Sequence, residues 1–82
     1  MHYVCDNGRH LICLPYSIAN LHTMAYNLGI HRSWFHEKEG RWHYDIPKKR
    51  IAEIQTKCEV VNTRTILEIM ELTQLDPQWN ST

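Results

Sequence analysis

The sequence predicts a single small α/β domain, with a short sheet of about three strands and three helices; an α+β arrangement of the same elements stays open. The chain has 82 residues, of which 43% are apolar, enough for one modest core and no second domain. Segments of strand composition alternate with segments of helical periodicity, as in folds that layer helices on a sheet. Because Asp76-Pro77 interrupts the last periodic segment, we place the domain at residues 1–75 and a loose tail at residues 76–82.

The first two strands are expected at residues 2–6 and 9–14, which have strand composition. Asn7-Gly8 lies between them and tolerates the positive φ angles of a tight primed turn. We therefore predict a hairpin, and Pro15 ends its second strand.

The first helix is the most clearly marked element. Ser17 is a favourable N-cap, and Gly29 suits the left-handed conformation that ends a helix. Between them, side chains recur at three- and four-residue steps along one helical face, namely Ile18, Leu21, His22, Ala25 and Leu28. The sequence predicts a helix over residues 18–28.

The middle of the chain is more polar. We expect extended segments at residues 33–36 and 42–46, separated by a polar loop at residues 37–41. Pro47 suits the first position of a helix, where its missing N–H is no loss. The apolar face of that second helix is Ile51, Ile54 and Cys58.

The last elements are a short strand at residues 59–62 and a helix that begins at Thr63. The face of this helix consists of Ile66, Ile69, Met70 and Thr73, with Leu67 beside it. It completes the order strand, strand, helix, extended segments, helix, strand, helix.

Charge and hydropathy exclude several classes of protein. Nine basic and nine acidic side chains give a formal net charge of zero, which argues against a binder of extended nucleic acid or of acidic membranes. The longest apolar run, residues 11–14, is far too short to span a bilayer, and the N-terminus has no signal-peptide pattern. We expect a cytoplasmic protein. Three cysteines without a CxxC pair predict buried thiols in a reducing compartment, namely Cys5, Cys13 and Cys58.

The segment from Trp42 to Pro47 carries the clearest chemistry. In an extended backbone His43 and Asp45 point to one face and Tyr44 to the other. The start of a helix favours an anion such as phosphate, and three cations follow at once, namely Lys48, Lys49 and Arg50. His43 and Asp45 are then candidates for acid/base catalysis or metal binding beside a phosphate group. The alternative is that Asp45 merely caps the helix and His43 hydrogen-bonds to it.

Two further histidines extend this hypothesis. His10 opens the second strand, and His22 lies on the apolar face of the first helix. If this helix packs on the sheet, the side chains that converge are His10, His22, His43 and Asp45. Three imidazoles and a carboxylate suit a divalent metal with an open position, although no HExxH or HxH motif is present. The alternative for His22 is a structural histidine satisfied within the core.

The remaining polar and aromatic residues of this region support weaker interpretations. His31 and His36 are interpreted as surface histidines; Arg32 and Arg41 either assist phosphate binding or are solvated charges. Aromatic side chains lie among basic residues, namely Trp34, Phe35 and Trp42. If exposed, together with Trp79, they would be anchors of a protein interface.

Several short motifs together resemble a known family. They are Tyr3-Val4-x-Asp6, His10-Leu11, Leu21-His22, Leu28-Gly29 and His43-Tyr44-Asp45-Ile46-Pro47. In this order, over residues 2–70, they resemble uncharacterised phage and bacterial proteins grouped as domain of unknown function 4031. The resemblance implies a site at the same four positions, with Asp6 and Tyr44 beside them. The chain departs from the family pattern at Leu14-Pro15-Tyr16, where members tend to carry an aspartate. That departure puts a catalytic activity in doubt and leaves a binding role open.

Two functions therefore stay open at this point. One is a small enzyme or binding domain whose His/Asp pocket takes a nucleotide or another phosphorylated ligand, with or without a divalent metal. The other is a non-catalytic phage accessory protein that inhibits a host enzyme or defence factor through an aromatic surface. In either case a homodimer would bury more apolar surface than so short a chain can bury alone.

Overall fold

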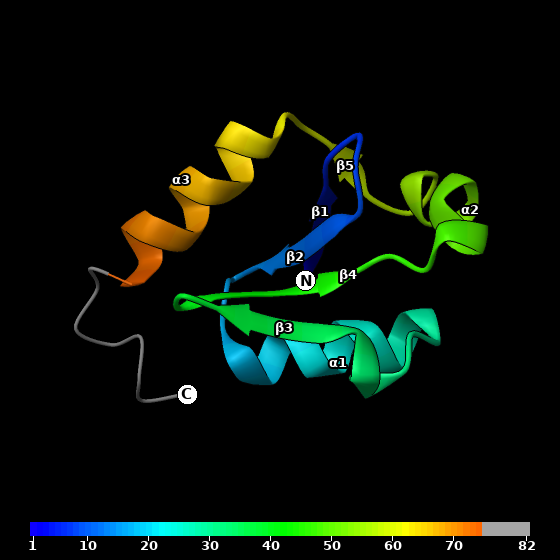
Figure 1. Ribbon diagram of the computed structural model, residues 1–82, viewed down its shortest axis with the longest axis horizontal. Helices are drawn as coiled ribbons and strands as arrows, with labels where there is room; N and C mark the ends of the chain where they lie inside the picture. Colours follow the sequence, from blue (N-terminus) through cyan, green and yellow to red (C-terminus); the bar gives the residue numbers. More distant parts are fainter. Residues whose placement is uncertain (75–82) are drawn as a thin grey trace.

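The computed structural model describes residues 1–74. Its centre is a five-stranded sheet in the order β3-β4-β2-β1-β5 (Figure 1). The strands are β1 (His2–Cys5), β2 (His10–Leu14), β3 (Phe35–Lys38), β4 (Arg41–Asp45) and β5 (Glu59–Val60). The helices are α1 (Ile18–Leu28), α2 (Ile51–Gln55) and α3 (Thr63–Gln74), with short 3-10 turns η1 (Arg32–Trp34) and η2 (Lys48–Arg50).

The sheet is mixed, which makes the fold α+β. β1 pairs with β5 in parallel, and the other neighbouring strands are antiparallel. The expected three strands become five because both extended segments on either side of the polar loop join the sheet as β3 and β4.

A tight turn joins β3 to β4. Glu39 and Gly40 both have positive φ angles, 54° and 74°, and Lys38 pairs with Arg41 on either side of them. A two-residue turn with this geometry matches the twist of the flanking strands. The loop expected at residues 37–41 is therefore shorter than predicted. The side-chain amide of Gln74 donates to the Gly40 carbonyl, which attaches the end of α3 to this turn.

The connection between β1 and β2 differs from the expected primed turn. Within residues 1–74, positive φ angles occur at Gly29, Glu39 and Gly40, and not at Asn7 or Gly8. Instead, Asp6 Oδ1 accepts from the backbone N–H groups of Gly8 and His10, at 2.8 and 3.2 Å. The carboxylate of Asp6, rather than the conformational freedom of Asn-Gly, shapes this turn.

The first helix confirms its predicted caps. Ser17 Oγ accepts from the N–H of Asn20 at 3.0 Å, and Gly29 ends the helix with φ of 68°. The buried side of α1 consists of Leu21, Met24, Ala25 and Leu28.

The second helix begins later than predicted. Pro47 precedes the 3-10 turn η2, and α2 starts at Ile51 and has five residues. Cys58 lies beyond its end. The helix dipole that was expected to attract an anion at Pro47 is therefore absent there. The helix starts four residues later, and a helix of five residues aligns few peptide groups.

The helices α1 and α3 cover opposite faces of the sheet (Figure 1). Because side chains alternate along a strand, Leu11 and Tyr44 face α1, and their neighbours His10 and His43 face α3. No helix within residues 1–74 has the length and apolar character needed to cross a membrane. The predicted tail, with Trp79, lies outside the described residues.

Candidate metal centre

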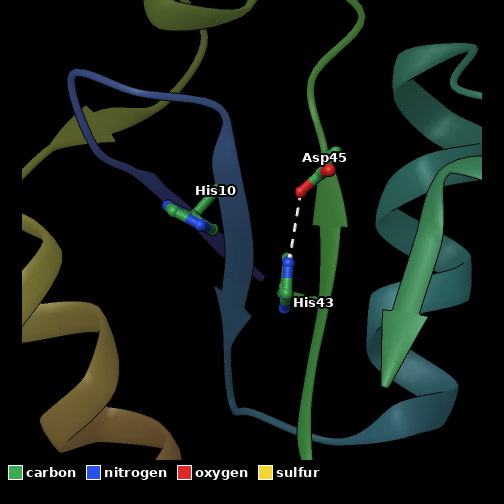
Figure 2. A group of neighbouring side chains, drawn as sticks. All are labelled: His10, His43 and Asp45. Atoms are coloured by element: carbon green, nitrogen blue, oxygen red, sulfur yellow. Dashed lines mark hydrogen bonds and ion pairs between the residues drawn. The ribbon is translucent and has the colours of Figure 1, made fainter. Parts of the chain in front are cut away.

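Three predicted site residues meet on the face of the sheet that α3 covers. His10 begins β2 and pairs with Asp45 on β4, and His43 lies two residues before Asp45 on the same side of that strand. One nitrogen or carboxylate oxygen from each residue lies within 4.8 Å of the others (Figure 2). We call this group the His/Asp cluster.

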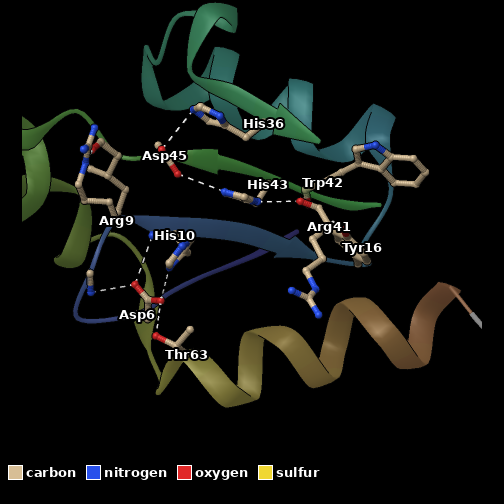
Figure 3. A network of polar contacts seen from close by, with 12 residues as sticks. Asp6, Arg9, His10, Tyr16, His36, Arg41, Trp42, His43, Asp45 and Thr63 are labelled. Atoms are coloured by element: carbon tan, nitrogen blue, oxygen red, sulfur yellow. Dashed lines mark hydrogen bonds and ion pairs between the residues drawn. The ribbon is translucent and has the colours of Figure 1, made fainter. Parts of the chain in front are cut away.

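His43 has one ring nitrogen fixed by the backbone. Its Nδ1 lies 2.8 Å from the Arg41 carbonyl oxygen, and its Nε2 lies 3.2 Å from Asp45 Oδ1 (Figure 3). A carbonyl oxygen only accepts, so Nδ1 carries the proton, and Nε2 of a neutral ring has a lone pair. That lone pair faces a carboxylate oxygen, and the two repel each other unless a cation stands between them. A divalent metal ion at this position would be coordinated by both atoms.

His10 is oriented by a buried carboxylate. Its Nδ1 lies 2.7 Å from Asp6 Oδ2, which also accepts from Thr63 Oγ1 at 2.7 Å (Figure 3). Burial by itself raises the pKa of Asp6, but the hydrogen bonds from Thr63 and His10 outweigh it and lower the pKa from its ordinary 3.8. With Nδ1 directed to an ionised carboxylate, His10 is left with Nε2 as its ligand nitrogen. Metal-binding histidines in proteins have such a partner on the other nitrogen.

His36 is exposed, as predicted, and it also adjoins this site. It pairs with His43 across β3 and β4, and the two rings stack with centroids 5.7 Å apart. Its Nε2 lies 3.2 Å from Asp45 Oδ2, so the Asp45 carboxylate is held between two imidazoles (Figure 3). Pairing residues 35–38 with residues 41–45 as a hairpin would have placed His36 on the same face as His43, and this is the signal that could have predicted its position.

A pocket of about 250 Å³ opens beside His10 and His43. α3 forms one wall with Thr63, Ile66, Leu67 and Met70, and the β3–β4 hairpin forms the other with Lys38, Glu39 and Arg41. Arg41 lies 3.9 Å from Glu39 and 3.8 Å from Glu71, whereas Lys38 makes no ion pair within residues 1–74. Two cations, Lys38 and Arg41, and the Glu39 carboxylate therefore line the pocket next to the cluster.

His22 does not join the cluster, so the expected convergence of all four residues is wrong for it. It lies on the α1 side, where its Nδ1 is 2.6 Å from the hydroxyl of Tyr44 and its ring contacts Phe35. Burial, with a smaller contribution from Arg32, lowers the pKa of His22. Tyr44 is 1% exposed, so the ligand-binding role expected of it has no access from this pocket. The structural interpretation of His22 fits these contacts.

The basic triplet after Pro47 also lies elsewhere. Arg50 donates to the carbonyl oxygens of Leu28 and Gly29 at 2.7 and 2.9 Å and pairs with Glu53, so it holds the end of α1. Lys48 and Lys49 line a different pocket. The cations beside the cluster are Lys38 and Arg41 instead.

The aromatic residues expected to be exposed are partly buried. Trp34, Phe35 and Trp42 pack against the core, and the Trp42 carbonyl accepts from Tyr16 at 2.7 Å. The large apolar side chains that the structure exposes within the described residues are Met1, Tyr26, Val60 and Leu72. These three side chains are therefore less exposed than the predicted aromatic surface requires.

The cysteines supply no ligand to the cluster. Cys5 and Cys13 are buried, Cys58 is half-buried, and all three are free thiols. Burial raises the pKa of all three, to about 12 for Cys13 and Cys58. Thiols with so high a pKa are poor nucleophiles and poor metal ligands at neutral pH.

Comparison with known proteins places the chain in a family. A family model described as "Protein of unknown function (DUF4031)" matches residues 6–73, which include Asp6, His10, His43 and Asp45. No curated protein and no solved structure matches significantly. The departure at Leu14-Pro15 lies at the opposite end of β2 from His10. Since the match spans most of the sequence and contains the whole His/Asp cluster, the chain belongs to the DUF4031 family.

Proposed function

We propose that the His/Asp cluster binds a divalent transition metal, through which the domain binds or acts on a small phosphorylated ligand such as a nucleotide. One observation carries the proposal: His43 Nδ1 is committed to the Arg41 carbonyl, while Nε2 faces Asp45 Oδ1 at 3.2 Å. A metal ion between them would replace repulsion by two coordinate bonds. With His10, the ligand set is two imidazoles and one carboxylate, which suits zinc or iron and leaves positions open.

The chain's own residues have separate tasks around this ion. His10 and His43 would hold it through Nε2, because Asp6 and the Arg41 carbonyl engage Nδ1 of each ring. His36 would steady Asp45 through the second carboxylate oxygen. When bound, the metal would supply a Lewis acid for a phosphoryl oxygen or for water.

Lys38 and Arg41 make a phosphate group the favoured ligand next to the metal. Both line the pocket beside His43, and Arg41 is held only loosely by its acidic neighbours. The pocket of about 250 Å³ is smaller than a typical site for a drug-sized ligand, which is roughly 300–1,000 Å³. It suits a small phosphate ester, or the phosphate end of a larger molecule.

The ligand part of this proposal is tested by calorimetric titration of phosphate and pyrophosphate into zinc-loaded and metal-free protein. We expect binding that requires zinc and weakens about tenfold in Lys38→Ala and in Arg41→Ala. Lys57→Ala is the matched control, because Lys57 is half-exposed and pairs with Glu53 on α2. Equal affinity with and without zinc, or equal loss in the control, would contradict the proposal.

The cytoplasm is the compartment we propose for this activity, because three free thiols suit a reducing environment. A homodimer stays a prediction. The host-binding accessory protein stays an alternative, although Trp34, Phe35 and Trp42 are partly buried against the core and Trp79 lies outside the described residues.

A further inference from the structure

We infer a second ligand site, distinct from the His/Asp cluster, that takes a nucleoside phosphate. It is a pocket of about 520 Å³ lined by Arg9, Trp34, Pro47, Lys48 and Lys49. This inference goes beyond the proposed metal centre and does not depend on it.

Three segments of the chain build the pocket at one end of the sheet. Arg9 comes from the β1–β2 connection, Trp34 ends η1, and Pro47 to Lys49 follow β4. The first and third segments are tied together, because Arg9 Nε donates to the Ile46 carbonyl at 2.8 Å and the Ile46 N–H donates to the Arg9 carbonyl at 2.7 Å. The pocket therefore rests on fixed backbone.

The charge around this pocket is uncompensated. Within residues 1–74, Arg9, Lys48 and Lys49 make no ion pair, and no carboxylate lines the pocket. Four of the other six cations are paired with glutamates, namely Arg41, Arg50, Lys57 and Arg64, whereas Arg32 and Lys38 make no ion pair within the described residues. In a chain of zero net charge, three unpaired cations around one cavity create a local attraction for an anion.

The interior of the pocket is mainly apolar, and this separates it from a simple phosphate site. The half-buried indole of Trp34 forms part of it, with the Arg9 guanidinium 5.5 Å above the ring centroid. Lysines commonly lay their alkyl stems along such apolar surface and keep the ammonium group in water. The apolar interior of the pocket thus suits a planar base beside an indole and a guanidinium, and the cations at its edge suit the phosphates.

The volume is consistent with this occupant. At about 520 Å³ the pocket lies within the roughly 300–1,000 Å³ of small-molecule sites. An apolar slot alone would favour an uncharged aromatic ligand, and cations alone would favour inorganic phosphate. Both features together select a molecule that has a base and a phosphate.

The site adjoins the His/Asp cluster along the chain but uses different side chains. Arg9 directly precedes His10, and Pro47 follows Asp45 by two residues. The two sites can therefore be disrupted separately. His43→Ala should abolish metal binding and leave ADP binding at this second pocket intact, so failure of one proposal is distinguishable from failure of the other.

Calorimetric titration of chelator-treated protein tests the inference, with ADP, adenosine and pyrophosphate as probes. We expect ADP to bind at least about tenfold more tightly than either half-ligand. The double variant Lys48→Glu/Lys49→Glu should weaken ADP at least about tenfold. The control Lys57→Glu/Arg64→Glu carries the same change of charge at positions just after α2 and on α3, and it should leave ADP binding unchanged.

The aromatic contribution is tested separately. Trp34→Leu should weaken ADP about tenfold and leave pyrophosphate unchanged, and Trp34→Phe should restore most of the affinity. Thermal melting confirms that each variant is folded, and the Phe variant remains decisive if the Leu variant unfolds. The inference is overturned if pyrophosphate binds as tightly as ADP, if the two double variants behave alike, or if a 12-nucleotide single strand binds far more tightly than ADP.

Discussion

Histidines lie against both faces of β4, and their surroundings are opposite. On the α3 side, His43 meets the Asp45 carboxylate, and a second imidazole holds the other oxygen of that carboxylate. On the α1 side, His22 meets the Tyr44 hydroxyl and an aromatic ring, and it makes no ion pair within residues 1–74. The difference shows what makes a histidine a candidate metal ligand. The chemical group that faces its unprotonated nitrogen matters more than how deeply the ring is buried.

The two faces of β4 should differ most in how much a substitution lowers the free energy of unfolding. Tyr44→Ala removes a side chain that is 1% exposed and should cost about 3–5 kcal/mol, because it leaves a cavity under α1. Asp45→Ala, on the same strand, should cost about 1 kcal/mol or less in metal-free protein, since its ion pairs are partly exposed. Urea unfolding measures both. An equal loss in the two variants would show that the His/Asp cluster is structural.

Asp6→Asn should affect both stability and metal binding, since Asp6 fixes His10. An amide cannot accept from Thr63, His10 and the turn N–H groups at once, so we expect a loss of about 1–3 kcal/mol. Zinc affinity should fall about 10–100-fold, as for other partners of ligand histidines. Thr63→Val, which removes one of these donors, should have the same effects to a smaller degree. Unchanged zinc affinity in Asp6→Asn would contradict the orienting role.

The same residue predicts how stability depends on acid. The folded chain lowers the pKa of Asp6 from 3.8, so the unfolded chain binds a proton more readily. Its stabilisation is fully present above about pH 3.8 and is lost as the pH falls through the lower folded pKa. Urea unfolding at pH 5, 4 and 3 should show a decline in the wild type and a shallower one in Asp6→Asn. Parallel declines would refute this assignment.

The smallest effect is expected on the α1 face. The folded chain lowers the pKa of His22 from 6.5, so its contribution to stability is present above that pH and is lost as the pH falls below it. The free energy of unfolding of His22→Gln should therefore change less between pH 7 and pH 5.5 than that of the wild type. A change as large as in the wild type would mean that His22 does not titrate differently on folding.

Local signals in the sequence were sufficient for α1 and for the alternation along β4. Ser17 and Gly29 act within a few residues of their positions, and the alternation of His43, Tyr44 and Asp45 follows from any extended backbone. These features depend on geometry that neighbouring residues determine.

The features that the sequence did not reveal depend on pairing and packing over longer distances. Helical periodicity shows that His22 points toward the sheet, but a sheet has two faces, and periodicity does not say which face a helix covers. His36 enters the site through the register of β3 on β4. Arg50 was predicted to bind phosphate together with Lys48 and Lys49. Instead, its guanidinium donates to the carbonyl oxygens at the end of α1.

The central claim is that His10, His43 and Asp45 bind one divalent metal ion. Calorimetric titration of zinc into tag-free, chelator-treated protein tests it most directly, with His43→Ala as the variant and the exposed His31→Ala as the matched control. We expect one zinc per chain in the wild type and in His31→Ala. The zinc affinity of His43→Ala should be lower by at least about 100-fold, since outer partners of ligand histidines alone contribute about 10–100-fold. Equal zinc affinity in the two variants, or no stoichiometric zinc in the wild type, would contradict it.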